Sequence, residues 1–232
     1  MIIPILSYHS INNNICPLSL NTKEFEKQLI FLKKNNYKSI YFNEIDLLQQ
    51  NQCVITFDDG YKDLIINALP LLKKYNFKAI CYIVANNIGK TNTWDSKNNL
   101  ILKKDLMSII DIQEWLKNGM SIGSHSFNHL DLTRLNKEDL KFQLSNSKFF
   151  LEDIIGNEIK SFCYPYGKYN NNVIKEVEYE YSNAVTTNRS RYNIKKHSKF
   201  LIPRIDMGKK LSLFKLYLKI QTIYEDIKNN EI

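Results

Sequence analysis

Short apolar runs alternate with amphipathic segments along the whole chain. The apolar runs are rich in β-branched residues and predict strands over residues 2–8, 38–42, 53–57, 77–84, 120–124, 160–164, 183–187 and 200–205. Between them, helical spacing predicts helices over residues 21–35, 43–50, 61–75, 105–118, 136–155 and 211–227, with a short helix after residue 167. This alternation predicts a parallel sheet, and roughly seven or eight strands favour closure into a barrel. We expect one α/β domain over residues 1–232.

The closing helical segment carries an apolar stripe. Residues with large apolar or aromatic side chains recur on one of its faces, at Leu213, Tyr217, Ile220, Tyr224 and Ile227. A stripe of this kind is typical of a helix that covers a core, and less typical of a helix that lies on a membrane. We therefore expect this face to be buried.

The chain is basic, with a formal net charge of +8. From Arg189 to Ile232 there are 11 basic and 4 acidic residues. Such a segment is usually a solvated face, although an anionic glycan, a lipid diphosphate or an anionic membrane surface would also suit it. Because no arginine-rich cluster is interleaved with aromatic residues, we expect no nucleic-acid partner.

The cysteines and the N-terminus bear on the cellular compartment. None of the four cysteines forms a C-x-x-C pair, and Cys53, Cys81 and Cys163 lie in apolar runs, which predicts buried free thiols. The first residues are apolar but lack a basic region and a cleavage site, so they do not resemble a signal peptide. No run reaches the length of a transmembrane helix. We expect a cytoplasmic protein, with peripheral contact to a membrane left open.

Residues that can do chemistry stand at or just after the ends of predicted strands. They are His9, Asp58, Asp59, His125, the Pro165-Tyr166 pair and Arg204. In parallel α/β folds the carboxyl ends of the strands meet at one edge, where active sites form. We therefore expect these side chains to gather on a single rim.

The histidine pair and the aspartate pair together predict a metal site. His125 and His129 are four residues apart, so they could bind one ion from a single helical turn. Two imidazoles and one carboxylate leave coordination positions open and suit zinc, iron, nickel or cobalt. Asp58 and Asp59 could supply one ligand and one general base that takes a proton from water. The structural alternative for the aspartates is a helix cap.

Two further residues enter through the chemistry they would supply. Cleavage of an amide requires a group that protonates the leaving amine, and His9 on the same rim could do so. Trp94 lies in the long polar connection 86–104 and could stack on a sugar ring, or simply pack within a lid.

The sequence resembles the polysaccharide deacetylases of carbohydrate esterase family four, the NodB-homology domain. The resemblance lies in Thr56-Phe57-Asp58-Asp59-Gly60, in the His125/His129 pair and in Tyr164-Pro165-Tyr166-Gly167. Tyr8-His9-Ser10-Ile11 and Leu201-Ile202-Pro203-Arg204-Ile205 are similar to the branch that deacetylates poly-β-1,6-N-acetylglucosamine.

This resemblance implies a distorted (β/α) barrel of seven to eight strands and a role for each residue. Asp58 would be the general base and His9 the general acid, while the backbone N–H of Tyr166 would face the oxyanion. Asp59, His125 and His129 would hold one divalent ion, with zinc as the first candidate and nickel, cobalt or iron as alternatives. Trp94, Pro165 and Arg204 would contact the substrate.

Two departures from the family pattern concern the base and the acid. Many members have an arginine that orients the base, two residues before the proline of the third motif, and here that position is Cys163. Another group must therefore orient Asp58. The late Leu-x-x-His motif is absent, which agrees with an acid role for His9.

We accordingly expect a metal-dependent hydrolase that removes N-acetyl groups from an amino sugar of a surface polysaccharide or its precursor. The partner would be an N-acetylated glycan or a lipid-linked sugar. The alternatives are a deformylase or O-deacetylase that acts on a lipid-linked sugar, and a glycan-binding domain without catalysis.

Overall fold

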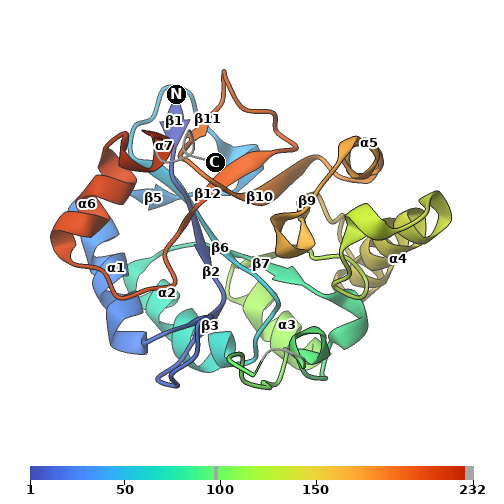
Figure 1. Ribbon diagram of the computed structural model, residues 1–232. Helices are drawn as coiled ribbons and strands as arrows, with labels where there is room; N and C mark the ends of the chain where they lie inside the picture. Colours follow the sequence, from blue (N-terminus) through green and yellow to red (C-terminus); the bar gives the residue numbers. More distant parts are fainter. Residues whose placement is uncertain (97–98, 228–232) are drawn as a thin grey trace.

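Seven parallel strands close into a barrel in the computed structural model, which describes residues 1–96 and 99–227 (Figure 1). The closed order is β2 (Ile5–Tyr8), β12 (Ile202–Asp206), β10 (Asn183–Arg189), β9 (Ser161–Cys163), β8 (Ser121–Ser124), β7 (Ile80–Ile83) and β6 (Gln52–Phe57). β2 pairs with both β12 and β6, and this double pairing closes the ring. The predicted single α/β barrel is confirmed.

The remaining strands are short and lie outside the ring. β5 (Lys38–Ser39) extends the sheet beyond β6, β1 (Ile2–Ile3) pairs antiparallel with β11 (Tyr192–Asn193), and β3 (Ser10–Ile11) pairs with β4 (Ser19–Leu20). Pro4 separates β1 from β2, because proline cannot donate a hydrogen bond to a neighbouring strand. The predicted strand over residues 2–8 is therefore two strands.

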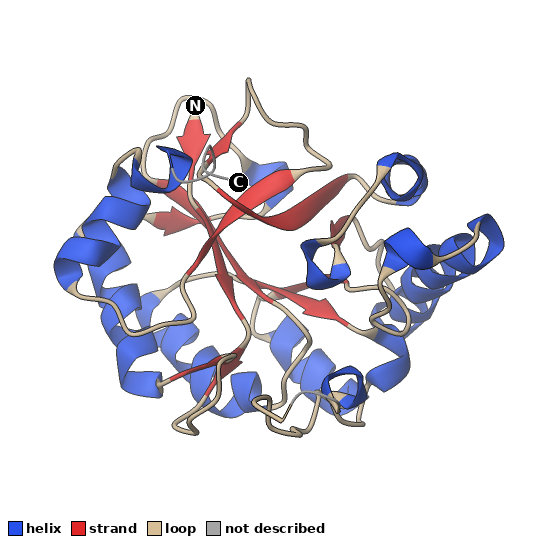
Figure 2. Ribbon diagram, viewed as in Figure 1, coloured by secondary structure: helices blue, strands red, loops and turns tan. Residues whose placement is uncertain are grey.

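Helices surround the barrel (Figure 2). They are α1 (Thr22–Lys34), α2 (Leu69–Tyr75), α3 (Ile109–Lys117), α4 (Lys137–Ile155), α5 (Asn171–Glu180), α6 (Leu213–Gln221) and α7 (Tyr224–Ile227). The caps follow from the sequence: the Asn136 side chain accepts from the N–H of Asp139 at the start of α4, and Gly156 ends α4 with φ of 67°. None of the described helices is both long and apolar enough to cross a bilayer.

Three predicted helices before the closing segment differ from those observed. Residues 43–50 form only a short 3₁₀ turn, Phe42–Glu44, and the helix expected from residue 105 begins at Ile109 after a capping box on Ser108. The segment after Gly60 becomes regular only at Leu64, where a π-helical turn, Leu64–Ala68, leads into α2.

The closing segment corrects the predicted apolar stripe. It breaks into α6 and α7, and Leu213, Tyr217 and Ile227 are 59%, 47% and 53% exposed. Ile220 is buried as predicted, and Leu216, which was not part of the predicted stripe, shares the buried face of α6. The break after Gln221 separates Tyr224 and Ile227 from the rest of the stripe, whereas Leu213 and Tyr217 are exposed within α6 itself.

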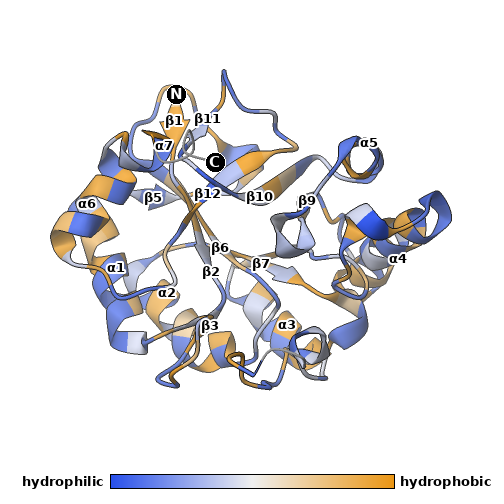
Figure 3. Ribbon diagram, in the orientation of Figure 1, coloured by the Kyte–Doolittle hydropathy of each residue, from blue (hydrophilic) through white to orange (hydrophobic). Residues whose placement is uncertain are grey.

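Residues along each barrel strand alternate between two apolar layers, as the two-residue repeat of a strand requires. One cluster fills the barrel interior and includes Ile5, Val54, Tyr82, Cys163 and Ile202. The larger cluster lies between the strands and the surrounding helices. Figure 3 shows the apolar colour running along the central strands. Cys53, Cys81 and Cys163 are buried free thiols, as predicted.

Candidate active site

A sharp turn after β6 places two carboxylates at the carboxyl end of the barrel. Asp59 and Gly60 both adopt left-handed backbone conformations, with φ of 73° and 74°. Few non-glycine residues adopt this conformation, although aspartate tolerates it better than most, and such backbone conformations cluster at functional sites. The φ of Gly60 favours glycine, and an added Cβ would lie 2.8 Å from Ile83 Cδ1, so the end of the Ile83 side chain would have to move. The turn leaves Asp58 and Asp59 side by side and only 3% and 4% exposed.

The structure brings Asp59, His125 and His129 together. Asp59 Oδ1 lies 3.5 Å from Nε2 of each histidine, and the two Nε2 atoms are 3.2 Å apart. Ligand atoms about 2.0–2.1 Å from a zinc ion in tetrahedral geometry are separated by about 3.3–3.4 Å. The three atoms therefore form a triangle of the size that a small divalent ion requires.

The two histidines do not share a helical turn, contrary to prediction. They follow β8 in an irregular loop in which Ser126 and His129 have φ of 63° and 55°. The loop is held because the N–H of His129 donates to Ser126 Oγ at 3.0 Å. Convergence of the two imidazoles thus depends on two left-handed residues and not on helical spacing.

The tautomer of His125 suits a metal ligand. Its Nδ1 lies 2.7 Å from the carbonyl oxygen of Cys163. A carbonyl can only accept, so Nδ1 carries the proton and the Nε2 lone pair faces Asp59. Burial lowers the pKa of His125 to about 4, so the imidazole is neutral at physiological pH.

The two aspartates have opposite electrostatic environments. Burial, together with the charge of Asp58, raises the pKa of Asp59 well above its usual range. Burial would also raise the pKa of Asp58, but the Arg204 guanidinium outweighs it and holds that pKa well below the usual range. Asp59 is therefore the carboxylate that lacks a protein cation, which a bound metal ion would supply.

Arg204 corrects a sequence prediction. It lies within β12, is 2% exposed, and forms two 2.7 Å hydrogen bonds to the carboxylate of Asp58. Its remaining contacts go to Thr56 Oγ1, the carbonyl of Thr186 and Cys163 Sγ, at 3.1, 2.8 and 3.3 Å. A side chain buried in this way beneath the base does not contact a substrate; it orients Asp58. The sequence could have indicated this inward orientation, because side chains two residues apart on a strand lie on the same face, and Arg204 is two residues after the inward-facing Ile202.

His9 faces the base from the end of β2. Its Nε2 lies 3.8 Å from Asp58 Oδ2, and its side chain is 30% exposed, so it can reach both the base and solvent. Desolvation lowers the pKa of His9 below 6.5, although the nearby Asp58 opposes this shift.

The third motif forms a tight turn beside the histidines. Pro165–Gly167 is a 3₁₀ turn in which Tyr166 has φ of 58°, and the Tyr166 ring lies edge-on against His129 with centroids 4.6 Å apart. Gly167 has φ of 67°, and a Cβ there would lie 1.8 Å from Thr187 Oγ1. The turn therefore presents Tyr166 at the rim, whereas Pro165 is buried. The roles of Tyr166 in oxyanion binding and of Pro165 in substrate binding stay predictions.

Trp94 reaches the same place from the connection after β7. Its ring stacks on the His129 imidazole, with centroids 4.6 Å apart and an angle of 27° between the planes. One face of Trp94 is thus occupied by a histidine, and a sugar ring would have to use the other. Its sugar-stacking role stays a prediction.

The donor set fits a divalent metal ion. Asp59, His125 and His129 supply one oxygen and two nitrogens, all buried. Among the described residues, Asp58, His125 and Cys163 also lie close enough to hold an ion. In that second group Asp58 is already ion-paired with Arg204, so the first group is the better metal site.

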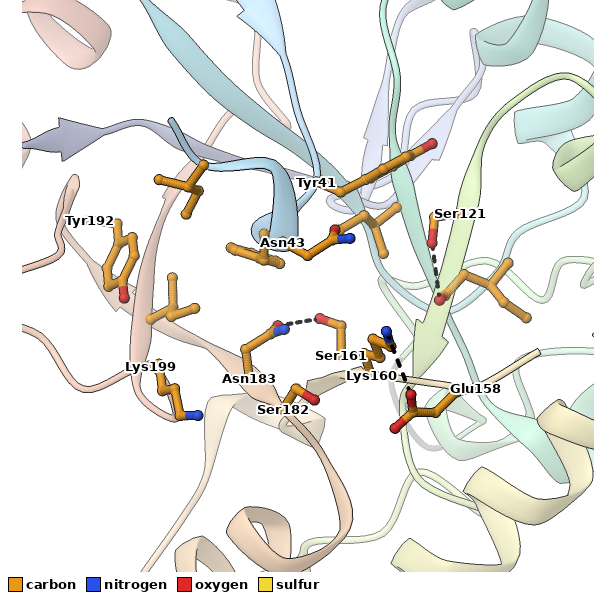
Figure 4. Close-up of a pocket in the computed structure, with 15 residues that line it drawn as sticks. Tyr41, Asn43, Ser121, Glu158, Lys160, Ser161, Ser182, Asn183, Tyr192 and Lys199 are labelled. Atoms are coloured by element: carbon orange, nitrogen blue, oxygen red, sulfur yellow. Dashed lines mark hydrogen bonds and ion pairs between the residues drawn. The ribbon is translucent and has the colours of Figure 1, made fainter. Parts of the chain in front are cut away.

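The opposite end of the barrel holds a separate cavity of about 560 Å³ (Figure 4). It is lined by residues at the amino ends of strands, including Ser161 and Asn183, which are hydrogen-bonded to each other at 2.7 Å. It contains none of the predicted site residues. In barrel enzymes chemistry occurs at the carboxyl end, which is where the Asp/His cluster lies.

The protein is an α/β-barrel protein with a candidate metal centre. This class is defined by the closed parallel barrel and by the cluster of carboxylates and imidazoles at the carboxyl ends of its strands. Residues 48–182 match the polysaccharide deacetylase family, and the chain belongs to that family. Its relatives include YxkH of Bacillus subtilis (strain 168), assigned by name to the polysaccharide deacetylases, which is 32% identical over 193 residues. That alignment covers 80% of this chain and 64% of YxkH, less than two thirds of that relative.

Two further proteins extend the comparison. A poly-β-1,6-N-acetyl-D-glucosamine N-deacetylase of Staphylococcus aureus (strain MRSA252) is 27% identical over 210 residues, which cover 81% of this chain and 70% of that protein. The crystal structure of BA0330 of Bacillus anthracis, also named as a polysaccharide deacetylase, superposes with a TM-score of 0.82 at 25% identity. The superposition covers 95% of the present chain and 69% of the BA0330 chain. The fold and family expected from the sequence are therefore confirmed.

Proposed function

We propose that the protein is a metal-dependent N-deacetylase that acts on an acetylated amino sugar of a surface polysaccharide or its precursor. The observation that carries the proposal is the triangle of Asp59, His125 and His129 beside the ion-paired Asp58. Family membership supports deacetylation, and the staphylococcal relative is named for removal of N-acetyl groups.

In this proposal each rim residue has one task. Asp59, His125 and His129 hold a divalent ion, which when bound supplies a Lewis acid that polarises a carbonyl and lowers the pKa of water. Asp58 accepts the proton of the attacking water, because Arg204 keeps its carboxylate ionised. The backbone N–H of Tyr166 stabilises the negative charge that develops on the acetyl oxygen. His9 then donates a proton to the leaving amine, so that acetate and a free amino sugar are released.

Acetate release from N-acetylglucosamine oligomers, with zinc or cobalt added, tests this function. Asp58→Asn keeps the size of the side chain but removes the base, so we expect its rate to be about 10²–10⁴-fold lower than that of the wild type. Equal rates in the two proteins would contradict the proposal. Parallel assays with N-formyl and O-acetyl sugars separate N-deacetylation from the deformylase and O-deacetylase alternatives, since the same rim could serve all three.

A further inference from the structure

The two candidate histidine ligands are held in different ways. A histidine that binds a metal through one nitrogen usually donates its other N–H to a carbonyl or carboxylate, which fixes the orientation of the ring. His125 follows this rule through the carbonyl oxygen of Cys163. His129 does not: its Nδ1 is buried and, within the part of the chain that the structure describes, it has no hydrogen-bond partner. No hydrogen bond at Nδ1 therefore fixes the orientation of this imidazole from the side away from the proposed metal site.

Aromatic rings enclose the His129 imidazole instead. Trp94 stacks on it nearly parallel, at 27° and 4.6 Å, and the Tyr166 ring meets it edge-on at 70° and 4.6 Å. Rotation of the imidazole about its Cβ–Cγ bond would tilt it into the Trp94 ring. The stack therefore holds the plane in which Nε2 points toward Asp59 and His125.

Trp94 is itself held firmly, which a positioning role requires. It lies in the 3₁₀ turn Thr93–Asp95, directly after Asn92, which is 2% exposed. The Asn92 side chain donates to Asp95 Oδ2 and to the carbonyl of Leu102, each at 3.1 Å, and accepts from the N–H of Lys104 at 2.7 Å. Asn92 thus ties the turn that contains Trp94 to Leu102 and Lys104 at the far end of the connection.

We propose that Trp94 is a positioning residue for the metal site: its ring replaces the missing hydrogen bond of His129 and sets the direction of the His129 Nε2 lone pair. The inference rests on the metal dependence proposed above. It predicts that metal affinity depends on the aromatic face at position 94, although Trp94 supplies no ligand atom.

The experiment measures Co²⁺ affinity by competition with a chromogenic chelator, and the absorption spectrum of bound Co²⁺, which reports ligand geometry. Loss of an orienting partner typically lowers metal affinity about 10–100-fold. We therefore expect Trp94→Leu to raise the Co²⁺ Kd by about 10–100-fold and to alter the spectrum. Trp94→Phe keeps an aromatic face and should lie between Trp94→Leu and the wild type.

Trp115 offers a matched control. It is buried, its ring contacts Phe57 and its Nε1–H donates to the carbonyl of Ser121, but it touches neither histidine. Trp115→Phe should lower the melting temperature and leave the Co²⁺ Kd and spectrum unchanged. This separates loss of stability from loss of ligand orientation.

His129→Ala distinguishes failure of this inference from failure of the metal site itself. If His129→Ala loses Co²⁺ while both Trp94 variants bind it as the wild type does, the positioning role is wrong and the metal site stands. If His129→Ala binds Co²⁺ with unchanged affinity and spectrum, the proposed metal site is wrong, and the inference falls with it. If Trp94→Leu fails to fold, Trp94→Met, which also removes the aromatic face, decides: a Kd equal to that of the wild type, with the same spectrum, contradicts the proposal.

Discussion

Arg204 and Asp58 form a buried, bidentate ion pair across the barrel interior, with both oxygen–nitrogen distances at 2.7 Å. The arginine comes from β12 and the aspartate from the turn after β6, 146 residues apart in the chain. The family resemblance leads one to expect an orienting arginine at the position of Cys163, and the Sγ of Cys163 lies 3.3 Å from the Arg204 guanidinium. In this protein the orienting cation therefore comes from a different strand and reaches the same carboxylate.

Arg204→Met should destabilise the protein strongly, because it leaves the Asp58 carboxylate buried without a partner. Breaking a buried ion pair in this way costs about 3–5 kcal/mol. The measurement is the free energy of unfolding in urea, with Asp58→Asn and the double variant completing a thermodynamic cycle. We expect the double variant to be more stable than Arg204→Met alone. If the effects of the two single variants simply add, the two residues are not coupled.

Metal removal should lower the thermal stability of the wild type but not of ligand variants. Metal at 100 times its Kd stabilises the folded state by about 2.7 kcal/mol. For a chain of this size that corresponds to roughly 5–10 °C in Tm. We expect a chelator to reverse the shift, and His125→Ala or Asp59→Ala to abolish it. A shift of unchanged size in His125→Ala would place the metal elsewhere.

The pH dependence of activity should report His9. A general acid must be protonated, so activity falls as the pH rises through the pKa of His9. Burial lowers that pKa, so we expect the midpoint of the alkaline limb of kcat/KM below 6.5. Asp58 must be ionised, and because Arg204 holds its pKa well below the usual range, it should produce no acid limb above about pH 4. His9→Gln should lose the alkaline limb; an unchanged limb in this variant would exclude His9 as the acid.

The free energy of unfolding of the metal-free protein should fall on acidification, because its buried imidazoles are neutral in the folded state and take up protons on unfolding. The folded pKa of His125 is about 4, below the ordinary value of about 6.5 for a histidine in the unfolded chain. The unfolded state therefore binds the proton first, and the free energy of unfolding falls as the pH drops from about 6.5 toward 4, by about 3 kcal/mol at most. Asp59, with its raised pKa, acts in the opposite direction. Urea unfolding at pH 7 and pH 5 should therefore show a steeper loss in the wild type than in His125→Asn, which retains Asp59. Equal slopes would contradict a buried neutral His125.

Gly167→Ala should lower activity through a steric clash, in addition to the strain of placing alanine at a positive φ. The new Cβ would lie 1.8 Å from Thr187 Oγ1, so the turn that presents Tyr166 must move. If the Tyr166 N–H stabilises the oxyanion, its displacement should lower kcat by about 10²–10³-fold. Gly156→Ala is the control, because Gly156 has the same φ of 67° but no atom within 4 Å of the added Cβ. We expect that variant to cost about 1–2 kcal/mol of stability and to keep its activity; an equal loss of kcat in both variants would rule out the clash as the cause.

Much of the fold and of the rim was predictable from the sequence, because the responsible forces are local. Apolar runs end where polar residues begin, so the strand that ends at Phe57 and the helix from Asn136 to Gly156 could be placed closely. Parallel strands align their carboxyl ends, so the placement of Asp59 and His125 on one rim followed from the predicted parallel sheet.

Other features were decided only by tertiary structure. β2 closes the barrel by pairing with both β12 and β6. This closure brings Arg204 of β12 to Asp58, which follows β6. The stack of Trp94 on His129 depends on the connection that Asn92 ties and on the left-handed backbone of His129. Such contacts join residues far apart in the chain, and no periodicity within one segment encodes them. The sequence by itself therefore determined the barrel and the chemical groups on its rim, whereas closure and loop packing determined which partner orients each group.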